Sequence, residues 1–383
     1  MQLNSGLRFL HNIPHPCMVD FFTELHSRSI DLTVYFQSRH HTERPWPVER
    51  DLPFPHEFLP GRMWHIGGRP VQTNSGIRRI VADHDRRDWW ILSGYLEPTL
   101  HLIAGDLNRK NIPWILLNES PYKNLDASSF RDFVRRVALR PVRRAKGIIV
   151  FGPPRDGAYF AARFPTKPVL PVPQLLDTQN LNAIAAKRKP RLSESSTIRA
   201  LFCGQWEPAK RADVLFEIAL EFVHNNEPVE FSFVGKGSLS EYFHKRAATD
   251  GRGRIWLHES LDKQHLLEEY EKANVVVQPV RNQGWGMTVT EGLAAGLPVI
   301  ASHGVGAAEG LIVNGQNGFL FEADDIAGMK DYLRLLIHDR ARLEAMTATA
   351  IQNAPQINIK VGVDKFLEAF ETIRRLSGLT PLR

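Results

Sequence analysis

The stretch from Val275 to Ile300 constrains the fold more than any other part of the sequence. It opens with a run of valines, which is typical of a strand buried in a parallel sheet. A glycine-rich loop follows over residues 283–286, and residues 287–295 have a helical pattern that ends at Gly296, with Pro298 just beyond. Residues 297–301 have the pattern of the next strand. This order of strand, loop, helix and strand predicts an α/β fold with a parallel sheet.

The loop and the start of the helix also predict an anion-binding site. A helix start at the carboxyl edge of a parallel sheet presents free backbone N–H groups and the positive end of the helix dipole. A diphosphate fits such a position, and Glu291, about one turn into the helix, could accept both hydroxyls of a ribose. Alternatively, Glu291 only interacts favourably with the helix dipole. The stretch alone leaves both interpretations open.

Length and composition set the broad class. A chain of 383 residues predicts two domains, and its hydrophobic content of 43% and charged content of 23% are typical of a soluble globular protein. Cys17 and Cys203 are its only cysteines, which argues against a disulfide scaffold or a cysteine zinc site and suits a reducing cytoplasm. No apolar run reaches transmembrane length, and the first residues do not form a signal peptide. The net charge of +6 suits an anionic ligand or a membrane surface, and no nucleic-acid motif is present.

The motifs of the second half resemble those of the retaining glycosyltransferases of family four (glycosyl transferases group 1), which have the GT-B architecture. In the stretch described above, Gly286, Glu291, Gly292 and residues 294–300 match the family pattern. The resemblance implies two Rossmann-like domains that face each other across a cleft, with a nucleotide diphosphate sugar bound by the second domain. Gln283 stands where the family has a Glu that touches the sugar, so it can hydrogen-bond sugar hydroxyls but carries no charge.

Two further loops match the family's phosphate-binding positions. Lys210 takes the place of the lysine that neutralises the diphosphate, whereas Gln205 replaces the usual arginine, for which Arg211 could substitute. The resemblance therefore implies a donor site made of these residues: Gly204, Gln205, Lys210, Gly235, Gly237, Gly284, Trp285, Gly286, Met287, Thr288 and Glu291. It makes Lys210 and Gln283 candidate catalytic residues.

The first half carries looser motifs. Residues 7–36 have a strand–helix–strand pattern, and the phrase around its first loop resembles the family's N-terminal phrase, with prolines where many relatives have a glycine pair. This places four residues on the acceptor side: His11, Asn12, His15 and Tyr95. Glu119, at the carboxyl end of a predicted strand over residues 113–117, is the third catalytic candidate. The alternative is that the histidines, Asn12 and Glu119 are ordinary polar loop residues.

The expected domains are an N-terminal acceptor-binding domain of residues 1–175, completed by a C-terminal helix within 363–383, and a nucleotide-sugar-binding domain of residues 176–362. The polar segment 177–196 is expected to connect them, and residues 40–63 to form an irregular loop. A helix is expected over residues 128–146. The usual explanation of its basic side chains is a solvated face, and the alternative is a contact with anionic lipid or a lipid-linked acceptor. These side chains are Arg131, Arg135, Arg136, Arg140, Arg143, Arg144 and Lys146.

These features predict an enzyme of polysaccharide biosynthesis that moves a sugar from a nucleotide diphosphate sugar to a glycan or lipid-linked acceptor with retention of configuration. We expect no cofactor and no metal, because we find no Asp-x-Asp motif and no His/Cys cluster with metal spacing. The expected location is the cytoplasm, with possible attachment to the inner face of the membrane.

The alternatives are a non-catalytic nucleotide-sugar or glycan-binding protein, since Gln205 and Gln283 replace charged residues, and a GT-B nucleotide-sugar epimerase. A dinucleotide oxidoreductase is disfavoured because no G-x-G-x-x-G follows the first strand. The sugar, the base and the acceptor are not encoded in any motif that we recognise.

Overall fold

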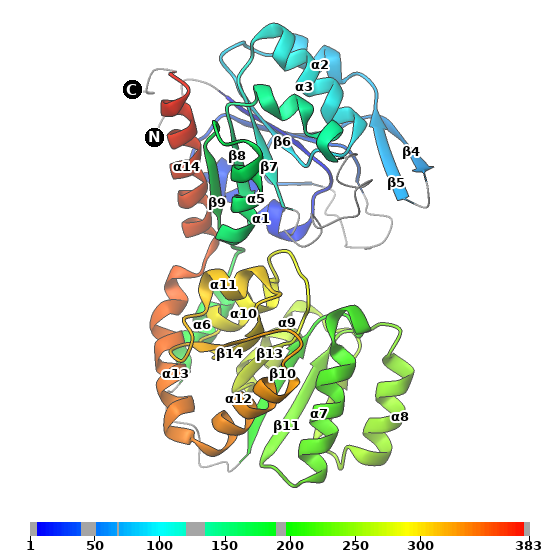
Figure 1. The fold of residues 1–383 in the computed structure, drawn as a ribbon, viewed down its shortest axis with the longest axis vertical. Helices are drawn as coiled ribbons and strands as arrows, with labels where there is room; N and C mark the ends of the chain where they lie inside the picture. The colour runs from blue at the N-terminus through cyan, green and yellow to red at the C-terminus, as the bar shows by residue number, and fades with distance from the viewer. Residues whose placement is uncertain (1–5, 40–50, 67–68, 120–134, 189–196, 379–383) are drawn as a thin grey trace. The chain divides into compact units, whose positions relative to one another are not determined.

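The computed structural model describes residues 6–39, 51–66, 69–119, 135–188 and 197–378. The chain forms two compact units, which are described separately below. Unit 1 comprises Met1–Leu176 and Ile359–Arg383, and unit 2 comprises Asp177–Asn358. Each unit contains a parallel sheet covered by helices (Figure 1). Where the sequence suggested boundaries at 175/176 and 362/363, the structure has them at 176/177 and 358/359.

The sheet of unit 1 has the strand order β3-β2-β1-β6-β7-β8-β9, and every neighbouring pair is parallel. Its strands are β1 (Leu7–His11), β2 (Leu32–Phe36), β3 (His56–Phe58), β6 (Trp89–Ser93), β7 (Trp114–Asn118), β8 (Gly147–Phe151) and β9 (Val169–Val172). Its helices are α1 (Pro16–Ser27), α2 (Ile77–Asp83), α3 (Pro98–Lys110), α5 (Pro154–Arg163) and α14 (Ile359–Leu376). Because β1, β6, β7 and β8 are buried along their whole length, both faces of the sheet carry apolar side chains, as expected for a parallel sheet under two helix layers.

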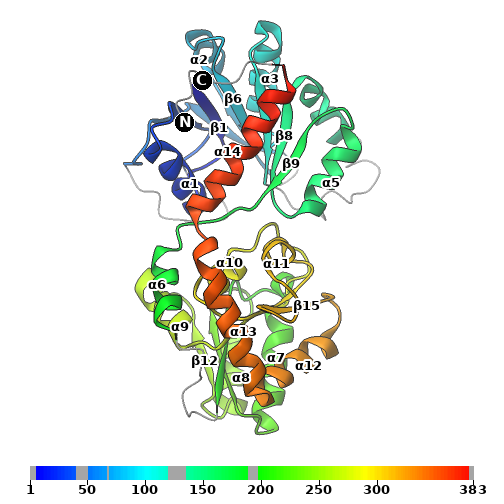
Figure 2. The ribbon, with the colours of Figure 1, turned by 90° about the vertical axis from the view of Figure 1, so that its left-hand side faces the viewer.

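The helix α14 closes one face of this sheet, although it lies at the far end of the sequence. Figure 2 shows α14 running across the strands beside α1. Phe366 packs edge-on against Phe21 with ring centroids 5.0 Å apart, and Phe370 packs in the same way on Trp89 at 5.2 Å. Gly147 allows a close approach, because a β-carbon there would come within 2.7 Å of Ile373. The C-terminal segment therefore completes the core of unit 1.

The sheet of unit 2 has the order β12-β11-β10-β13-β14-β15, again with parallel neighbours. Its strands are β10 (Ile198–Cys203), β11 (Val229–Val234), β12 (Ile255–His258), β13 (Val275–Gln278), β14 (Val299–Ser302) and β15 (Gly318–Phe321). Its helices are α6 (Gln179–Lys187), α7 (Ala212–His224), α8 (Ser240–Asp250), α9 (Lys263–Lys272), α10 (Met287–Ala294), α11 (Gly306–Leu311), α12 (Ile326–His338) and α13 (Arg340–Asn353). The order predicted for residues 275–300 is confirmed as β13, α10 and β14. The helices α8 and α11 were not predicted.

The prediction of a connecting segment over 177–196 is wrong for the part that forms α6. This helix belongs to unit 2, where its polar side chains satisfy backbone carbonyls at the end of α10. The Asn182 amide donates to the Ala294 carbonyl at 3.1 Å, and the Arg188 guanidinium donates to the Ala295 carbonyl at 3.1 Å. Asn182 and Arg188 therefore cap α10, whereas Asp177, Gln179, Asn180 and Lys187 are exposed to solvent.

Two other expectations hold only in part. Within the segment 40–63, the structure describes β3 and the start of an antiparallel hairpin, β4 (Gly61–Ile66) with β5 (Arg69–Asn74), while residues 40–50 lie outside the described residues. The helix expected over 128–146 is described from residue 135 and gives way to a 3-10 helix, η2 (Arg140–Arg144). Pro141 explains the change, because proline lacks the N–H that an α-helix needs.

Four cationic side chains around η2 are exposed, and we call them the basic turn: Arg140, Arg143, Arg144 and Lys146. Arg131, which was expected on the same face, lies outside the described residues. In the part of the chain that the structure describes, no helix combines the length and the apolar character needed to cross a membrane.

Candidate functional site

The loops after β10 and β11 lie side by side because glycine allows it. Gly235 has a φ of 145°, and a β-carbon added there would overlap the carbonyl oxygen of Gly204. A β-carbon at Gly237 would likewise overlap the carbonyl of Trp206. The Gly204 amide donates to the Val234 carbonyl at 2.9 Å, which joins the two loops at the carboxyl edge of the sheet. Three of the predicted donor-site glycines thus form one backbone surface without side chains.

Lys210 ends a short 3-10 helix, η3 (Pro208–Lys210), just before α7, and its side chain is half-buried. Gln205, in the same loop, is exposed. Arg211 adopts a left-handed backbone with φ of 55°, and its guanidinium donates to the Ala323 carbonyl and, at 2.9 Å, to Asp324. Because Arg211 is buried and engaged in these contacts, it acts here as a link to the loop before α12 rather than as a substitute for the arginine missing at position 205.

The loop of residues 283–286 is held by the loop that precedes α11. The backbone N–H of Gln283 donates to the Gly304 carbonyl at 2.9 Å, and the backbone N–H of Gly306 donates to the Gly284 carbonyl at 3.0 Å. Gly286 has a φ of 89°, which is a conformation that favours glycine, and it forms the N-cap of α10. Gln283 remains half-buried at the start of this loop.

Trp285 differs from its expected role. Its indole is buried, donates to the Thr290 hydroxyl at 2.9 Å and lies close to Gly310 of α11. Any part of Trp285 in ligand binding would have to come from its backbone. Met287 and Thr288, at the start of α10, are half-buried, and the Thr288 hydroxyl donates to the Cys203 carbonyl at 3.2 Å, which ties α10 to the end of β10.

Glu291 has a buried partner that sequence reasoning missed. The Tyr270 hydroxyl, from α9, donates to Glu291 Oε2 at 2.6 Å, and Tyr270 is 1% exposed. Burial raises the pKa of the Glu291 carboxyl, and the hydrogen bond from Tyr270 opposes that rise. One carboxylate oxygen is thereby oriented by the protein. The only signal in the sequence was a tyrosine on the helix that precedes the strand β13. Its position predicts that the tyrosine is buried, but it does not predict Glu291 as the partner.

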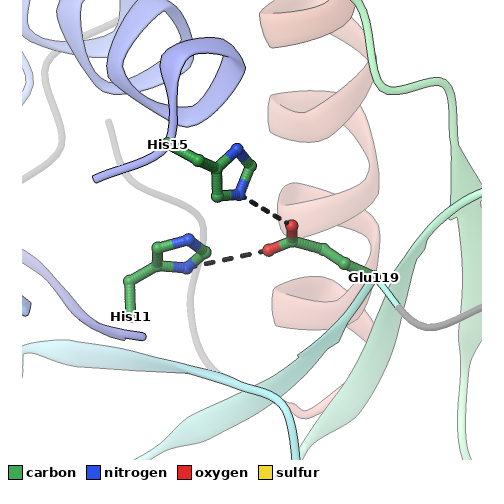
Figure 3. A group of neighbouring side chains, drawn as sticks. All are labelled: His11, His15 and Glu119. Atoms are coloured by element: carbon green, nitrogen blue, oxygen red, sulfur yellow. Dashed lines mark hydrogen bonds and ion pairs between the residues drawn. The ribbon is translucent and has the colours of Figure 1, made fainter. Parts of the chain in front are cut away.

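In unit 1, three of the predicted residues come together. Figure 3 shows His11 and His15 both directed at the carboxylate of Glu119. His15 Nε2 lies 3.2 Å from Glu119 Oε2, and His11 Nδ1 lies 3.7 Å from Glu119 Oε1. His11 ends β1 and Glu119 follows β7, while β6, which lies between them in the sheet, contributes Ser93 at 2.8 Å from His11 Nδ1. The carboxyl ends of three neighbouring strands therefore build this cluster.

The three groups have different charge states. Burial lowers the pKa of His11 to about 4 despite the charge of Glu119, so this imidazole is neutral at pH 7. Burial also opposes the charge on His15, but the charges and hydrogen bonds of Cys17 and Glu119 outweigh it and raise the pKa of His15 to about 10. The two histidines likewise overcome burial and lower the pKa of Glu119. A neutral imidazole thus lies beside an imidazolium–carboxylate pair.

The cluster contains atom types that also bind metals. One ligand atom from each of His11, His15 and Glu119 lies within 4.8 Å of the other two. However, His15 uses Nε2 toward Glu119 and Nδ1 toward Cys17, at 3.2 Å and 3.0 Å. A metal could reach His15 only by displacing one of these partners, so we interpret the group as a charged, hydrogen-bonded cluster.

The other two acceptor-side candidates lie apart from these three. Asn12 is exposed, and its side-chain oxygen accepts a hydrogen bond from Gln37 at 2.7 Å. Tyr95 is 4% exposed and packs edge-on against Phe160 in the apolar core between the sheet and α3. The structure therefore brings together His11, His15 and Glu119 but places the Tyr95 ring in the core.

One family model matches a large part of unit 2. Residues 184–356 match the family model described as glycosyl transferases group 1. This part of the chain is therefore similar to the glycosyl transferases group 1. The matched segment falls within unit 2 and contains Lys210, Gln283 and Glu291.

Curated relatives match part of the chain. D-inositol 3-phosphate glycosyltransferase 1 of Catenulispora acidiphila is 30% identical over 182 residues, which cover 45% of this chain and 43% of the relative. The lipopolysaccharide core biosynthesis mannosyltransferase LpsB of Rhizobium meliloti is 36% identical over 84 residues, 21% of this chain and 24% of that protein. The chain thus spans less than half the length of these curated relatives.

Solved structures match nearly the whole chain. HepE of Anabaena, in complex with UDP, aligns with a TM-score of 0.72 and 15% identity, covering 96% of this chain and all of that one. Sucrose-phosphate synthase from Thermosynechococcus elongatus aligns with a TM-score of 0.69 and 13% identity, covering 97% of this chain and 99% of its own. At this identity the likeness shows the fold, and it confirms the expected α/β fold of the GT-B class with two Rossmann-like units.

Proposed function

We propose that the protein is a glycosyltransferase that moves a sugar from a nucleotide diphosphate sugar to a glycan or lipid-linked acceptor, with retention of the anomeric configuration. The observation that carries the proposal is the arrangement around α10. A glycine-capped helix start lies at the carboxyl edge of the sheet, and a half-buried carboxylate, Glu291, is held by Tyr270 one turn further on. Backbone N–H groups suit a diphosphate, and a carboxylate suits the hydroxyls of a ribose.

In this proposal, unit 2 stabilises the leaving group. The barrier to transfer is departure of the diphosphate from a sugar with oxocarbenium character, so negative charge builds up on the phosphate oxygens. Lys210 and the start of α10 would neutralise that charge, and the paired loops at Gly204 and Gly235 would let the phosphates approach the backbone. Gln283 would hydrogen-bond the sugar without adding a charge. The donor is a substrate, and no cofactor or metal is part of the proposal.

Unit 1 would bind the acceptor through the cluster of His11, His15 and Glu119. A neutral imidazole at His11 can accept a hydrogen bond from a sugar hydroxyl, and the ionised Glu119 can accept another. These are the interactions that an acceptor hydroxyl needs as it loses its proton during transfer.

Two observations guide the choice of ligands. HepE of Anabaena, one of the structural matches, is described in complex with UDP and with UDP-glucose, so a uridine nucleotide is our first probe. The exposed basic turn of unit 1 would suit an anionic membrane surface, which is where a lipid-linked acceptor would be found. We therefore include a cytoplasmic location with peripheral attachment to the membrane in the proposal.

A thermal-shift screen of nucleotide sugars, followed by product analysis, tests the proposal. A donor should raise the melting temperature by mass action, and Glu291→Ala should remove most of that rise. The nucleoside diphosphate should then be released in amounts that depend on an added acceptor. An isomerised nucleotide sugar formed without acceptor would instead indicate an epimerase, and stabilisation without any turnover would indicate a binding protein.

A further inference from the structure

A pocket lies on one face of the unit 2 sheet, where the edge strand β12 contributes to its wall. Its volume is about 590 Å³, which falls within the range of about 300–1,000 Å³ that is typical of sites for small molecules. We call it the β12 pocket, and its lining includes Arg199, Glu230, Trp256, His258, Lys272 and Asn274.

The β12 pocket lies largely apart from the proposed donor site. Arg199, Glu230 and Trp256 are each the second residue of their strand, in β10, β11 and β12. The donor loops follow the other ends of β10 and β11. A strand rises about 3.3 Å per residue, so Arg199 lies roughly 16 Å before the loop that follows β10. His258 marks the side nearest the donor loops, because its carbonyl accepts the backbone N–H of Gly235 at 2.8 Å.

The face of the sheet that lines the β12 pocket is polar, whereas the opposite face is apolar. Ala200, Phe202 and Phe231 belong to the hydrophobic core on the opposite face. Alternate residues of a strand point to opposite faces, so Arg199 and Glu230, which are direct cross-strand partners, point to the pocket. A parallel sheet covered by helices normally has apolar residues on both faces, and a departure from such a rule often marks a functional position.

Trp256 supplies an apolar wall. Its side chain is 44% exposed, although tryptophan is highly buried on average. The Arg199 guanidinium lies over the indole, 5.6 Å from the ring centre, and is itself held by Glu230 at 2.7 Å. The exposed part of the indole therefore presents a flat apolar surface beside a fixed ion pair.

The charges of the β12 pocket are mostly paired with one another. Arg199 pairs with Glu230 at 2.7 Å, and Lys272 pairs with Glu269, which also lines the pocket, at 3.1 Å. Arg340 is the remaining Arg, Lys, Asp or Glu side chain of the lining, and it takes part in an interaction of its own. Paired charges suit a neutral polar ligand better than an anion or a cation.

We propose that the β12 pocket binds a neutral saccharide and is a second sugar site of the protein. A sugar ring combines an apolar C–H face, which stacks on Trp256, with hydroxyls that both donate and accept hydrogen bonds. Both hydrogen bonds from the Arg199 side chain to Glu230 end on Oε2, at 2.7 and 3.2 Å, so Oε1 can accept one from a hydroxyl. The Asn274 side-chain oxygen accepts the backbone N–H of Arg199 at 2.7 Å, so its NH₂ group can donate to another hydroxyl.

This site goes beyond the proposed transfer reaction, because it holds a sugar without acting on it. Its ligand is a sugar residue of an oligosaccharide rather than the nucleotide sugar, whose diphosphate finds no unpaired cationic cluster here. The inference does not depend on the transferase proposal, since binding is measured without donor and without turnover.

The test is calorimetric titration of the full chain with five neutral hexasaccharides, each with and without UDP. The probes are maltohexaose, cellohexaose, isomaltohexaose, mannohexaose and chitohexaose. At least one should bind in the millimolar range or more tightly, and its affinity should be the same in the presence of UDP. Competition by UDP would assign the saccharide to the donor site and overturn the proposal, as would the absence of binding by all five. Saccharide binding without any response to a nucleotide would count against the transferase proposal and not against the β12 pocket.

Variants locate the binding. Trp256→Ala should weaken the saccharide about tenfold or more, and Trp256→Phe, which keeps an aromatic ring, should retain most of the affinity. Glu230→Gln should also weaken it, because the acceptor loses its charge. The matched control is Trp64→Ala in β4, since Trp64 is a tryptophan of similar exposure, at 50%, in unit 1. Thermal unfolding checks that each variant is folded. Equal affinities in the Trp256→Ala, Glu230→Gln and Trp64→Ala proteins would overturn the proposal.

Discussion

The hydrogen bond between Tyr270 and Glu291 should contribute to the stability of unit 2 and to the pH dependence of that stability. Tyr270→Phe removes the hydroxyl that donates to Glu291 Oε2 at 2.6 Å and leaves the buried ring in place. No large cavity is created, so the loss reports the contacts of the hydroxyl, which are with Glu291 and with the Cys203 thiol. Because the acceptor is a charged carboxylate and the donor Tyr270 is buried, we expect a loss of about 1.5–3 kcal/mol when Glu291 is ionised. For a unit of this size, that corresponds to a melting temperature lower by roughly 3–12 °C.

The sign of the pH effect follows from the direction of the shift. The folded-state pKa of Glu291 is raised by burial, so its neutral form is favoured by folding, and stability from this group is lost as the pH rises through the folded pKa. Tyr270 opposes that rise, so Tyr270→Phe should raise the pKa of Glu291 further. The stability difference between wild type and variant should therefore widen as the pH rises from 5 to 8.

The assay is a double-mutant cycle measured by thermal unfolding at pH 5 and pH 8. The four proteins are wild type, Tyr270→Phe, Glu291→Gln and the double variant. With Gln at position 291 only a neutral hydrogen bond remains, so Tyr270→Phe should cost about 1 kcal/mol less there than it costs beside Glu291. Equal losses in both backgrounds, together with no change between the two pH values, would refute the reasoning that Tyr270 acts through the charge of Glu291.

Three further outcomes are expected. Lys210→Ala should leave the fold intact and reduce turnover in steady-state kinetics, because about 2–4 kcal/mol of transition-state stabilisation is lost. Unchanged turnover would show that Lys210 is not part of the site. Gly235→Ala should lower the melting temperature far more than Gly253→Ala. Both glycines have a positive φ, but only at position 235 would the new β-carbon overlap backbone atoms. Equal effects on the melting temperature would contradict the close approach of the loops after β10 and β11. In a flotation assay, binding to anionic liposomes should fall steeply with salt and should weaken when the cationic residues of the basic turn are substituted by neutral ones. Equal binding to neutral and anionic vesicles would instead support the interpretation of a solvated face.

Local patterns predicted the parts of the fold in which neighbouring residues carry the information. The strand, glycine loop, helix and strand over β13, α10 and β14 were predictable because valines, Gly286 and Gly296 determine the backbone over short distances. The helix α6 was missed because its Asn182 and Arg188 bind carbonyls more than a hundred residues away in sequence. Polarity alone does not distinguish such capping side chains from solvated ones.

The candidate site shows the same limit. His11 and Glu119 could each be placed at the carboxyl end of a strand, but their meeting depends on the sheet order β1-β6-β7, which no local pattern encodes. The pairing of Tyr270 with Glu291 and of Cys17 with His15 was not predicted either. For Glu291 and His15, the surroundings in three dimensions shift the pKa, and residue type alone does not predict that shift.

The most direct test of the central claim is the calorimetric affinity of unit 2 for a nucleoside diphosphate, measured on the full chain with UDP first and GDP and ADP in parallel. Glu291→Ala should weaken the nucleotide that binds by roughly 10–150-fold, since each hydrogen bond to the carboxylate contributes about 1.5–3 kcal/mol. Gln283→Ala should leave that affinity unchanged and instead reduce turnover with the intact donor, and Gln283→Glu should test the missing charge. If Gln283→Ala weakens the diphosphate as much as Glu291→Ala does, or if neither variant affects it, the proposed nucleotide-sugar site is contradicted.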